Sequence, residues 1–329
     1  MYSRLAILRL VLALCVVLTH SWFAAFQMAG GMAVVCFFFI SGFLVAGLLR
    51  ETYAGRPGAF LSNRFLRIFP IYWVCLLLAL PIVGQLPFDS YEIGRLMGWP
   101  ETSWQWLFNL VLIGEGWAMP RVIGTSWSLG VELGFYVLLF FFYTLFQRWR
   151  ILLLCLLFLA SFTPLAAVSA VLHFGYALAL GALCFEVKLA LPRAVAVTCA
   201  LLLAAAMLVA PAVMDHQRYS PESAAYMILA PLLLFVAFSL FTELRSDSRF
   251  AALCGSISYP LFLLHMPIAV LLTWLGMPEQ GPVSFLLTSL CSLVASYLVV
   301  IAVERPLVPL RRALRERRAA ARNGLSRAT

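Results

Sequence analysis

Two ionisable side chains, Arg9 and His20, lie inside the first apolar run of the chain, "RLAILRLVLALCVVLTHSW" (residues 4–22). Each costs roughly 2.5 to 3.5 kcal/mol to insert into a membrane, so each is expected to have a structural partner or a function. Their spacing places them within about 20° of one helical face and about 16 Å apart along the axis. An arginine binds anions and an imidazole transfers protons near neutral pH. The pair predicts one polar wall carrying both functions, although His20 could instead be an ordinary interfacial histidine.

A second basic pair, Arg64 and Arg67, lies in "SNRFLRIFP" (residues 62–70). The i, i+3 spacing projects both side chains to the same side of a helix. Two guanidiniums together suit phosphates, which the planar fork binds with two hydrogen bonds. Plain anchoring of the span by positive charge is the alternative. Arg9 at a similar depth favours an anion site.

Two further segments carry polar groups, "GTSWSLGVELGFY" (residues 124–136) and "ISYPLFLLHMP" (residues 257–267). Glu132 is expected in the same half of the membrane as His20, where a carboxylate would orient the imidazole or stabilise its charged form. A partner for the helix dipole is the alternative for Glu132. Ser258 is expected to cap a helix, and His265 to extend the polar track on the same face.

The elements that must position these groups are membrane helices. Of the 329 residues, 64% are hydrophobic and 11% are charged, and the mean hydropathy is +0.98. Such values indicate an integral membrane protein of the helical class. We expect an all-α, polytopic transmembrane bundle over residues 1–304, followed by a basic cytoplasmic tail, 305–329. The expected spans are 5–23, 31–49, 68–84, 128–147, 151–168, 171–187, 194–213, 224–242, 257–275 and 283–303.

Charge sets the expected topology. With ten spans and a cytoplasmic N-terminus, only Arg95, Arg121 and Arg218 of the 23 Lys and Arg residues fall on the outer face. The positive-inside rule therefore places both ends in the cytoplasm. The net charge of +9 follows from this topology and does not indicate a nucleic-acid partner, and we expect the basic tail to bind anionic lipid heads. The Trp-rich connection 85–127 is expected to cap a cavity or dip into the membrane.

The eight cysteines have no metal-ligand spacing, so we expect neither a metal site nor disulfides. They are Cys15, Cys36, Cys75, Cys155, Cys184, Cys199, Cys254 and Cys291.

In order and spacing, these segments resemble the integral-membrane acyltransferase-3 family of bacteria. The resemblance rests on Arg9 and His20, on "GGMAVVCFFFISGFLVAGLL" (residues 30–49), on "RFLR", on "SWSLGVELGFY", on "SYPLFLLHMP" and on "VERP" (residues 303–306). It implies an O-acyltransferase in the bacterial inner membrane that moves an acyl group, typically acetyl, from cytoplasmic acyl-CoA to a hydroxyl of an extracytoplasmic or membrane-linked carbohydrate.

The same resemblance implies roles for the polar residues. Arg64 and Arg67, with Arg9, would hold the nucleotide phosphates of the donor. His20 would be the general base and Glu132 its orienting partner, while His265 would help bind the donor or stabilise the oxyanion. A direct ternary mechanism is the simplest, because no activated Ser or Cys pairs with His20.

Other classes of function remain open at this point. A polytopic transporter or flippase for a glycan-related substrate would use the same groups as a relay, although no inverted repeat supports it. A second alternative is an enzyme of the other membrane O-acyltransferase family, which uses an Asn and a His deep in the membrane. This chain has no Asn well placed inside an expected span to partner a histidine. A structural subunit of an export complex would not need His20. The acceptor, the acyl chain length, a covalent intermediate and homo-oligomerisation are likewise left open.

Overall fold

The computed structural model describes residues 3–113, 119–187, 198, 201–202 and 248–314, and this part of the chain is helical without strands. The all-α class predicted from the sequence is therefore confirmed. The α-helices are α1 (Ser3–Ser21), α2 (Phe23–Gly47), α3 (Pro57–Gln85), α4 (Ser103–Val111), α5 (Trp127–Thr144), α6 (Arg150–Ala160), α7 (Ala170–His173), α8 (Gly175–Val187), α11 (Arg249–Trp274) and α12 (Pro282–Val299).

Five helical segments of the described chain are long and apolar enough to cross a membrane. They are Ala29–Thr52, Pro57–Gln85, Gly124–Thr144, Arg249–Trp274 and Pro282–Leu314. Three shorter apolar helices, Leu5–Ser21, Arg150–Ala160 and Gly175–Val187, fall where spans were also expected. The expected spans 194–213 and 224–242 lie, apart from residues 198 and 201–202, outside the described residues, as does the tail after residue 314.

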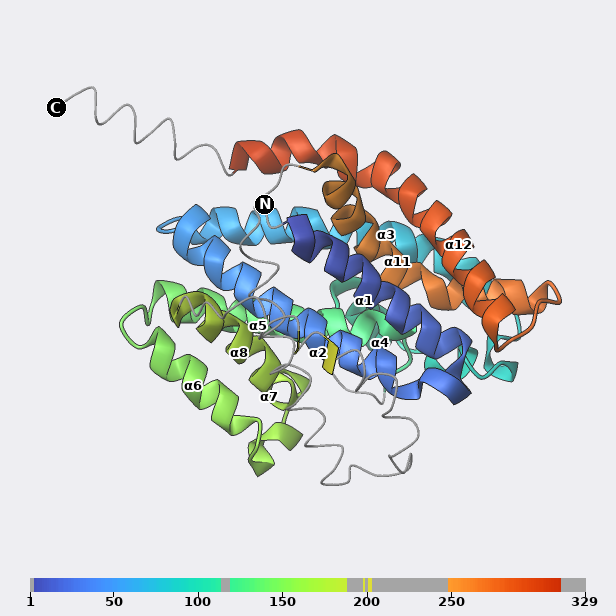
Figure 1. The fold of residues 1–329 in the computed structure, drawn as a ribbon, viewed down its shortest axis with the longest axis horizontal. Helices are drawn as coiled ribbons and strands as arrows, with labels where there is room; N and C mark the ends of the chain where they lie inside the picture. The colour runs from blue at the N-terminus through green and yellow to red at the C-terminus, as the bar shows by residue number, and fades with distance from the viewer. Residues whose placement is uncertain (1–2, 114–118, 188–197, 199–200, 203–247, 315–329) are drawn as a thin grey trace.

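The helices pack as successive layers across the molecule (Figure 1). Helix α2 contacts α8 on one side and α1 on the other, and α8 in turn contacts α6. On its far side α1 contacts α11 and α12, and α3 packs against α11. Helix α1 therefore has packed helices on both sides, which is consistent with polar side chains on it facing protein.

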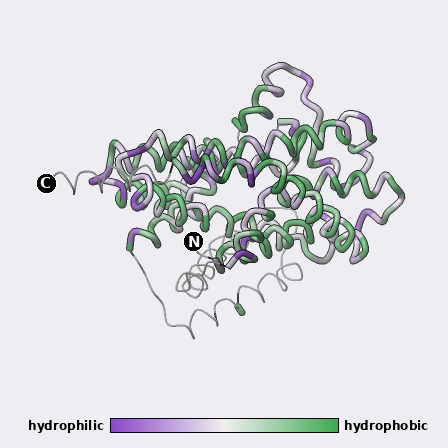
Figure 2. The backbone as a smooth tube through the Cα atoms, turned by 90° about the horizontal axis from the view of Figure 1, so that it is seen from above, coloured by the Kyte–Doolittle hydropathy of each residue, from purple (hydrophilic) through white to green (hydrophobic). Residues whose placement is uncertain are grey.

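Burial separates the central helix from the peripheral ones. In the most apolar window, 72% of the Ala29–Thr52 segment is buried, against 39% for Pro57–Gln85 and 33% for Pro282–Leu314. Figure 2 shows hydrophobic residues along most of each described helix. The apolar surface of the peripheral helices suits contact with lipid tails.

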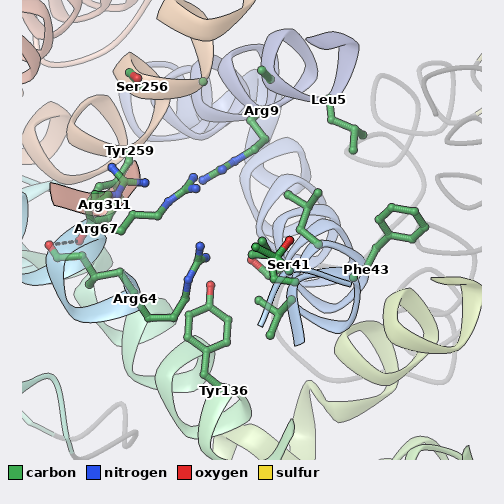
Figure 3. A pocket seen from close by; sticks show the side chains of 18 of the residues that line it. Leu5, Arg9, Ser41, Phe43, Arg64, Arg67, Tyr136, Ser256, Tyr259 and Arg311 are labelled. Atoms are coloured by element: carbon green, nitrogen blue, oxygen red, sulfur yellow. Dashed lines mark hydrogen bonds between the residues drawn. The ribbon is translucent and has the colours of Figure 1, made fainter. Parts of the chain in front are cut away.

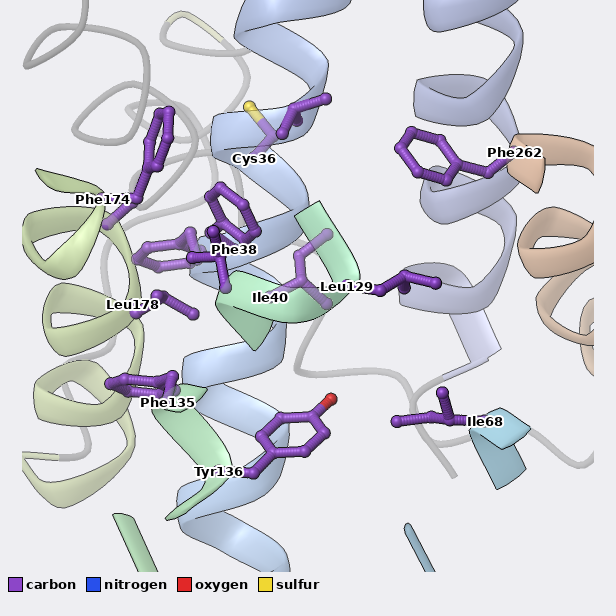
Figure 4. Close-up of a cluster of buried hydrophobic side chains, with 14 of the residues drawn as sticks. Cys36, Phe38, Ile40, Ile68, Leu129, Phe135, Tyr136, Phe174, Leu178 and Phe262 are labelled. Carbon is purple, nitrogen blue, oxygen red and sulfur yellow. The ribbon is translucent and has the colours of Figure 1, made fainter. Parts of the chain in front are cut away.

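Two glycines allow α2 and α8 to cross in close contact. A Cβ on Gly42 would lie 2.0 Å from the carbonyl oxygen of Leu178, and one on Gly181 would lie 2.0 Å from that of Phe39. Small residues that bring backbones together are the usual basis of helix association in membranes. Aromatic packing continues this interface, with Phe38 5.1 Å from Phe174 between ring centroids (Figure 4).

Two helices begin well before the expected spans. Helix α3 begins at Pro57 rather than near residue 68, and α11 begins at Arg249 rather than at residue 257. Ser248 caps α11, so the expected cap at Ser258 is wrong, and the Ser258 hydroxyl instead donates to the Gly255 carbonyl. The extra turns were missed because they carry polar residues, such as Asn63 and Arg64 in α3, that lower the local hydropathy.

The connection between α3 and α5 is anchored by Asn109, which is buried in α4. Its amide nitrogen donates to the carbonyls of Gln105 (2.9 Å) and Pro120 (3.0 Å), and its amide oxygen accepts from Val122 N–H (3.1 Å). The Tyr72 hydroxyl donates to the Asn109 carbonyl at 2.6 Å. Helix α4 therefore lies beside the middle of α3.

Candidate active site

A cavity of about 820 Å³ opens at the end of the bundle where α1 and α3 begin. Its lining comes from α1, α2, α3, α5, α8 and α11, and from the helical turns that follow α2 and α12. The charged lining residues are five arginines and three glutamates: Arg9, Arg64, Arg67, Arg311, Arg312, Glu51, Glu132 and Glu304. The described lining therefore carries an excess of positive charge and suits an anionic ligand.

The guanidinium of Arg64 is buried in this wall at 5% exposure. It lies 5.9 Å from the ring centroids of both Phe60 and Tyr136. Its Nε and Nη2 atoms have no hydrogen-bond partner among the described residues. Buried N–H groups of a charged side chain are costly when they lack acceptors, so this position favours an anion supplied by a ligand.

Arg9 and Arg67 line the same cavity as Arg64. Figure 3 shows the three guanidiniums extending into one space from α1 and α3, with Ser41 on the opposite wall and Tyr136 below. The spacing of Arg64 and Arg67 thus brings both to one side, as the i, i+3 pattern predicts.

Glu132 lies in this cavity too, and its partners differ from the expected one. The Ser41 and Tyr136 hydroxyls both donate to its Oε1 atom. His20, by contrast, does not line the cavity and stacks on a different residue. The expectation that Glu132 would orient His20 is therefore not met by the contacts. One physical reason is that Glu132 lies in the second turn of α5, close to Arg9 and Arg64.

Two short π-helical turns shape the rim of the cavity. One is η1 (Leu48–Thr52), after α2, and the other is η6 (Val300–Glu304), after α12. Each contributes a carboxylate to the lining, Glu51 and Glu304 respectively. Single π turns within helices are frequent at functional sites, because they redirect side chains.

Behind the main cavity lies a much smaller one of about 40 Å³. The two share Arg9, Ser41, Glu132 and Tyr259 in their linings, so they adjoin. The small cavity is walled by apolar side chains that include Phe37 and Phe262, whose rings meet edge to face at 5.9 Å. We call this small cavity, together with its wall, the neck.

The two histidines lie next to a residue of the neck. The His20 and His265 rings stack with centroids 5.3 Å apart and an interplanar angle of 28°. The Phe262 ring of the neck is 6.3 Å from His265. His265 is fully buried and His20 is partly exposed.

One tautomer of His265 is favoured by its surroundings. Its Nδ1 atom is 3.3 Å from the carbonyl oxygen of Leu261. Because a carbonyl only accepts, Nδ1 carries the hydrogen, and Nε2 of the neutral ring is an acceptor. That Nε2 atom is buried and has no partner among the described residues. The histidine pair therefore presents a buried acceptor to the space around it.

The end of α1 that carries His20 is fixed through its backbone. The carbonyl oxygens of His20 and Ser21 are among those that a helix end leaves free. The Gln280 side chain donates to the first at 3.4 Å, and Gly281 N–H donates to the second at 2.9 Å. The loop between α11 and α12 thus holds the position of His20.

The neighbouring Thr19 fixes His20 from the other side. Helix α2 is kinked at Phe26, where φ is −136° and ψ is 31°. The Thr19 hydroxyl lies in this kink, accepting from Gly30 N–H at 2.6 Å and donating to the Phe26 carbonyl at 2.7 Å. It therefore bridges two groups that would bond directly in a regular helix.

The comparisons with known proteins agree with these observations. The Acyl_transf_3 family model, described as an acyltransferase domain, matches residues 2–305. The chain belongs to the acyltransferase-3 family. Searches among curated proteins and among solved structures gave no match. The match in this family member spans α1 to η6 and thus includes both histidines and the three arginines on α1 and α3.

Sequence reasoning missed several site residues of this acyltransferase. Tyr136 follows Glu132 by one helical turn, a spacing that could have predicted their contact. Ser41 and Phe262 were part of recognised motifs, but nothing in the sequence connects them to the neck. Arg311 belongs to the stretch interpreted as a basic tail, and its place in the cavity depends on the path of α12.

The family member also contains a charged cluster away from the cavity. The Glu186 side chain, 1% exposed, pairs with Arg50 and with Arg150 (3.1 Å), and accepts from the Tyr143 hydroxyl at 2.8 Å. These groups come from α5, α6, α8 and η1. We interpret this cluster as a structural clamp. No group of three or more potential metal-binding side chains occurs within the described ranges.

Proposed function

We propose that the protein transfers an acyl group, acetyl in the simplest case, from acyl-CoA to a carbohydrate hydroxyl across a bacterial inner membrane. The observation that carries this proposal is the buried Arg64 guanidinium, with two unpartnered N–H-bearing atoms, in a cavity that adjoins the neck. An anionic head group fits the positively charged cavity, and a narrow reactive arm fits the adjoining neck.

The donor's phosphates would bind Arg9, Arg64 and Arg67. Guanidiniums bind phosphate with paired, charge-assisted hydrogen bonds. Arg9 lines both the cavity and the neck, so a phosphate on it lies next to the path that the arm takes. The rise of α1 separates Arg9 from His20 by about 16 Å, a length comparable to an extended phosphopantetheine arm.

Membrane orientation follows from charge in this proposal. With both chain ends in the cytoplasm, the cavity opens to the cytoplasmic pool of acyl-CoA and His20 lies toward the outer face. An acceptor hydroxyl would then approach His20 from outside. The partial exposure of His20 is compatible with such access, and the aromatic residues of the α3–α5 connection offer faces for sugar rings.

His20 is the general base in the proposed reaction. A ring nitrogen of His20 takes the proton of the acceptor hydroxyl as its oxygen forms a bond to the thioester carbonyl carbon. The carbon–sulfur bond then breaks, and the same proton passes to the CoA sulfur. The products are the O-acylated carbohydrate and free CoA thiol.

Glu132 and His265 take roles that follow from their contacts. Glu132 holds the Ser41 and Tyr136 hydroxyls at the entrance of the neck, and so positions the wall along which the arm passes. With Nδ1–H directed to Leu261, neutral His265 has an acceptor and not a donor to offer, so it suits an N–H of the arm better than an oxyanion.

The proposal is tested by release of CoA thiol from acetyl-CoA, using purified protein in nanodiscs with a glycan extract as acceptor. His20→Ala should lower kcat by roughly 10²- to 10⁴-fold, the usual effect of losing a general base, while CoA binding persists. Arg64→Gln should weaken CoA binding roughly 10- to 100-fold, because charge-assisted hydrogen bonds are lost.

Matched controls separate these effects from general damage. His173→Ala removes a histidine outside both cavities, and Arg148→Gln removes an exposed arginine that does not line them. Both should behave as wild type. A folded wild-type protein that neither binds nor cleaves acetyl-CoA would refute the proposal, as would full turnover in the His20 variant.

A further inference from the structure

The C-terminal turns of the described chain are part of the cavity. After η6 the helix continues to residue 314, and Arg311 and Arg312 both line the cavity. The sequence had suggested only that this basic stretch meets lipid head groups. Its place in the lining calls for a second explanation.

Side chains at the start of α3 hold these turns through hydrogen bonds to their backbone carbonyls. The Asn63 side chain donates to the Arg311 carbonyl at 3.3 Å, and Arg56 donates to the Leu314 carbonyl at 3.3 Å. Asn63 directly precedes Arg64 in the chain and is itself buried. The C-terminal turns are therefore fixed next to the phosphate-binding arginines.

The three arginines of these turns differ in whether they line the cavity. Arg311 is buried at 8% exposure and pairs with Glu304 at 3.2 Å. Arg312 is exposed and lines the cavity. Arg305, from the same stretch, lies 5.9 Å from the centroid of the Tyr297 ring and does not line the cavity. The cavity thus receives two of these three cations.

Exposure distinguishes Arg312 from the cavity arginines of α1 and α3. Arg64 is buried, Arg9 and Arg67 are partly exposed, and Arg312 is exposed. Arg9 adjoins the neck, so the reactive end of a ligand lies on that side. Arg312 is then the cation suited to the end of the ligand farthest from its reactive group.

We propose that Arg312, on a turn held by the Arg311–Glu304 pair, forms an outer anion site that binds the 3′-phosphate of the CoA nucleotide. This assignment rests on the proposed function and extends it, since a nucleotide thioester with two separate phosphate groups matches two sets of cations. Arg312 contacts the phosphate, and the Arg311–Glu304 pair holds the turn that presents it. A phosphate monoester at an exposed arginine is a charge-assisted contact that salt weakens.

The test compares CoA with 3′-dephospho-CoA, which lacks only this phosphate. Binding is measured by calorimetry on the full chain in nanodiscs made from zwitterionic lipid alone. Wild type should bind CoA more tightly than 3′-dephospho-CoA. Arg312→Gln should weaken CoA binding roughly 5- to 10-fold, as expected for a partly screened charged contact, and leave 3′-dephospho-CoA unchanged. Arg311→Gln should act in the same direction.

Arg305→Gln is the matched control, because it removes an exposed charge from the same turns without touching the cavity. It should leave both affinities unchanged. Equal loss of both ligands in the Arg312 variant, or no loss of either, would overturn the outer site. The measurement is repeated in nanodiscs that contain anionic lipid. An Arg312 effect that appears only there would assign Arg312 to lipid head groups instead.

The same measurement distinguishes this assignment from the proposed function. If wild type binds CoA and 3′-dephospho-CoA equally well, the outer site is refuted while the acyl-CoA proposal stands. If wild type binds neither ligand, both fall.

Discussion

The amide of Gly30 donates to the hydroxyl of Thr19 at 2.6 Å, across the interface between α2 and α1. The same hydroxyl donates to the Phe26 carbonyl, so one side chain of α1 completes the hydrogen bonding of a kinked α2. Thr19 immediately precedes His20. The proposed catalytic group is thus held by a threonine that is itself tied to the backbone of another helix.

Thr19→Val should lower both stability and turnover. Valine has the shape of threonine but leaves Gly30 N–H and the Phe26 carbonyl without their partner, at a cost of about 1–3 kcal/mol. Thr19→Ser keeps the hydroxyl and should remain close to wild type. Thermal unfolding in detergent and kcat for thiol release measure the difference. A valine variant as stable and active as the serine variant would contradict the positioning role.

The adjacent glycines 30 and 31 should respond oppositely to alanine. A Cβ on Gly30 would lie 2.9 Å from the Thr19 hydroxyl oxygen, whereas one on Gly31 would meet nothing within 4 Å. Gly31→Ala should therefore stabilise the protein by about 0.5–1 kcal/mol, the usual gain in a helix. Gly30→Ala should destabilise it by about 1–3 kcal/mol through overpacking. Unfolding temperatures of the two variants check this, and equal temperatures would argue against the contact.

His265→Asn should raise the KM for acetyl-CoA roughly 5- to 20-fold, consistent with loss of one hydrogen bond at a buried site. Asparagine can keep a donor near the Leu261 carbonyl but lacks the acceptor at Nε2, whereas glutamine carries an oxygen near that position. His265→Gln should therefore lie closer to wild type. Steady-state kinetics of the two variants are compared. A large loss of kcat in both with unchanged KM would instead make His265 the base.

Phe262→Ala should uncouple thioester cleavage from transfer. Removing the ring opens the neck beside Phe37, so water reaches the thioester more easily. The expected result is a higher ratio of acetyl-CoA hydrolysis to glycan acetylation, at a stability cost of about 3–5 kcal/mol. Phe262→Leu should cost less stability than Phe262→Ala. Phe250→Ala, on the same helix but at a position that is 66% exposed, controls for loss of an aromatic ring. An unchanged ratio would remove Phe262 from the neck's function.

Glu186→Ala should destabilise the protein while the surviving folded molecules keep their activity. The buried carboxylate contacts two arginines and a tyrosine, and breaking such a cluster costs about 3–5 kcal/mol. Arg50→Gln should cost less, because Arg50 is 43% exposed and screened. Thermal unfolding and turnover per folded molecule are measured together. A drop in turnover per folded molecule would show that the cluster does more than clamp helices.

The helical class and the shared side of Arg64 and Arg67 on α3 were accessible from the sequence, because hydropathy and helical periodicity act locally. The starts of α3 and α11 were not, since their polar turns face a cavity that only the assembled bundle creates. Glu132 was expected beside His20 because depth was inferred from position along each span. Which of the glycines 30 and 31 touches Thr19 depends on helix rotation, which two identical residues cannot reveal.

The neck has a consequence for the membrane itself. A path that joins cytoplasm to exterior would dissipate the proton and ion gradients that the membrane maintains. The space of about 40 Å³ between Phe37 and Phe262 has room for a few waters and an apolar wall that hydrated ions cross poorly. In the proposed reaction, a thioester arm that fills this space during turnover would keep it sealed. The proposed reaction would thus move chemical groups across a lipid barrier while the membrane remains electrically insulating.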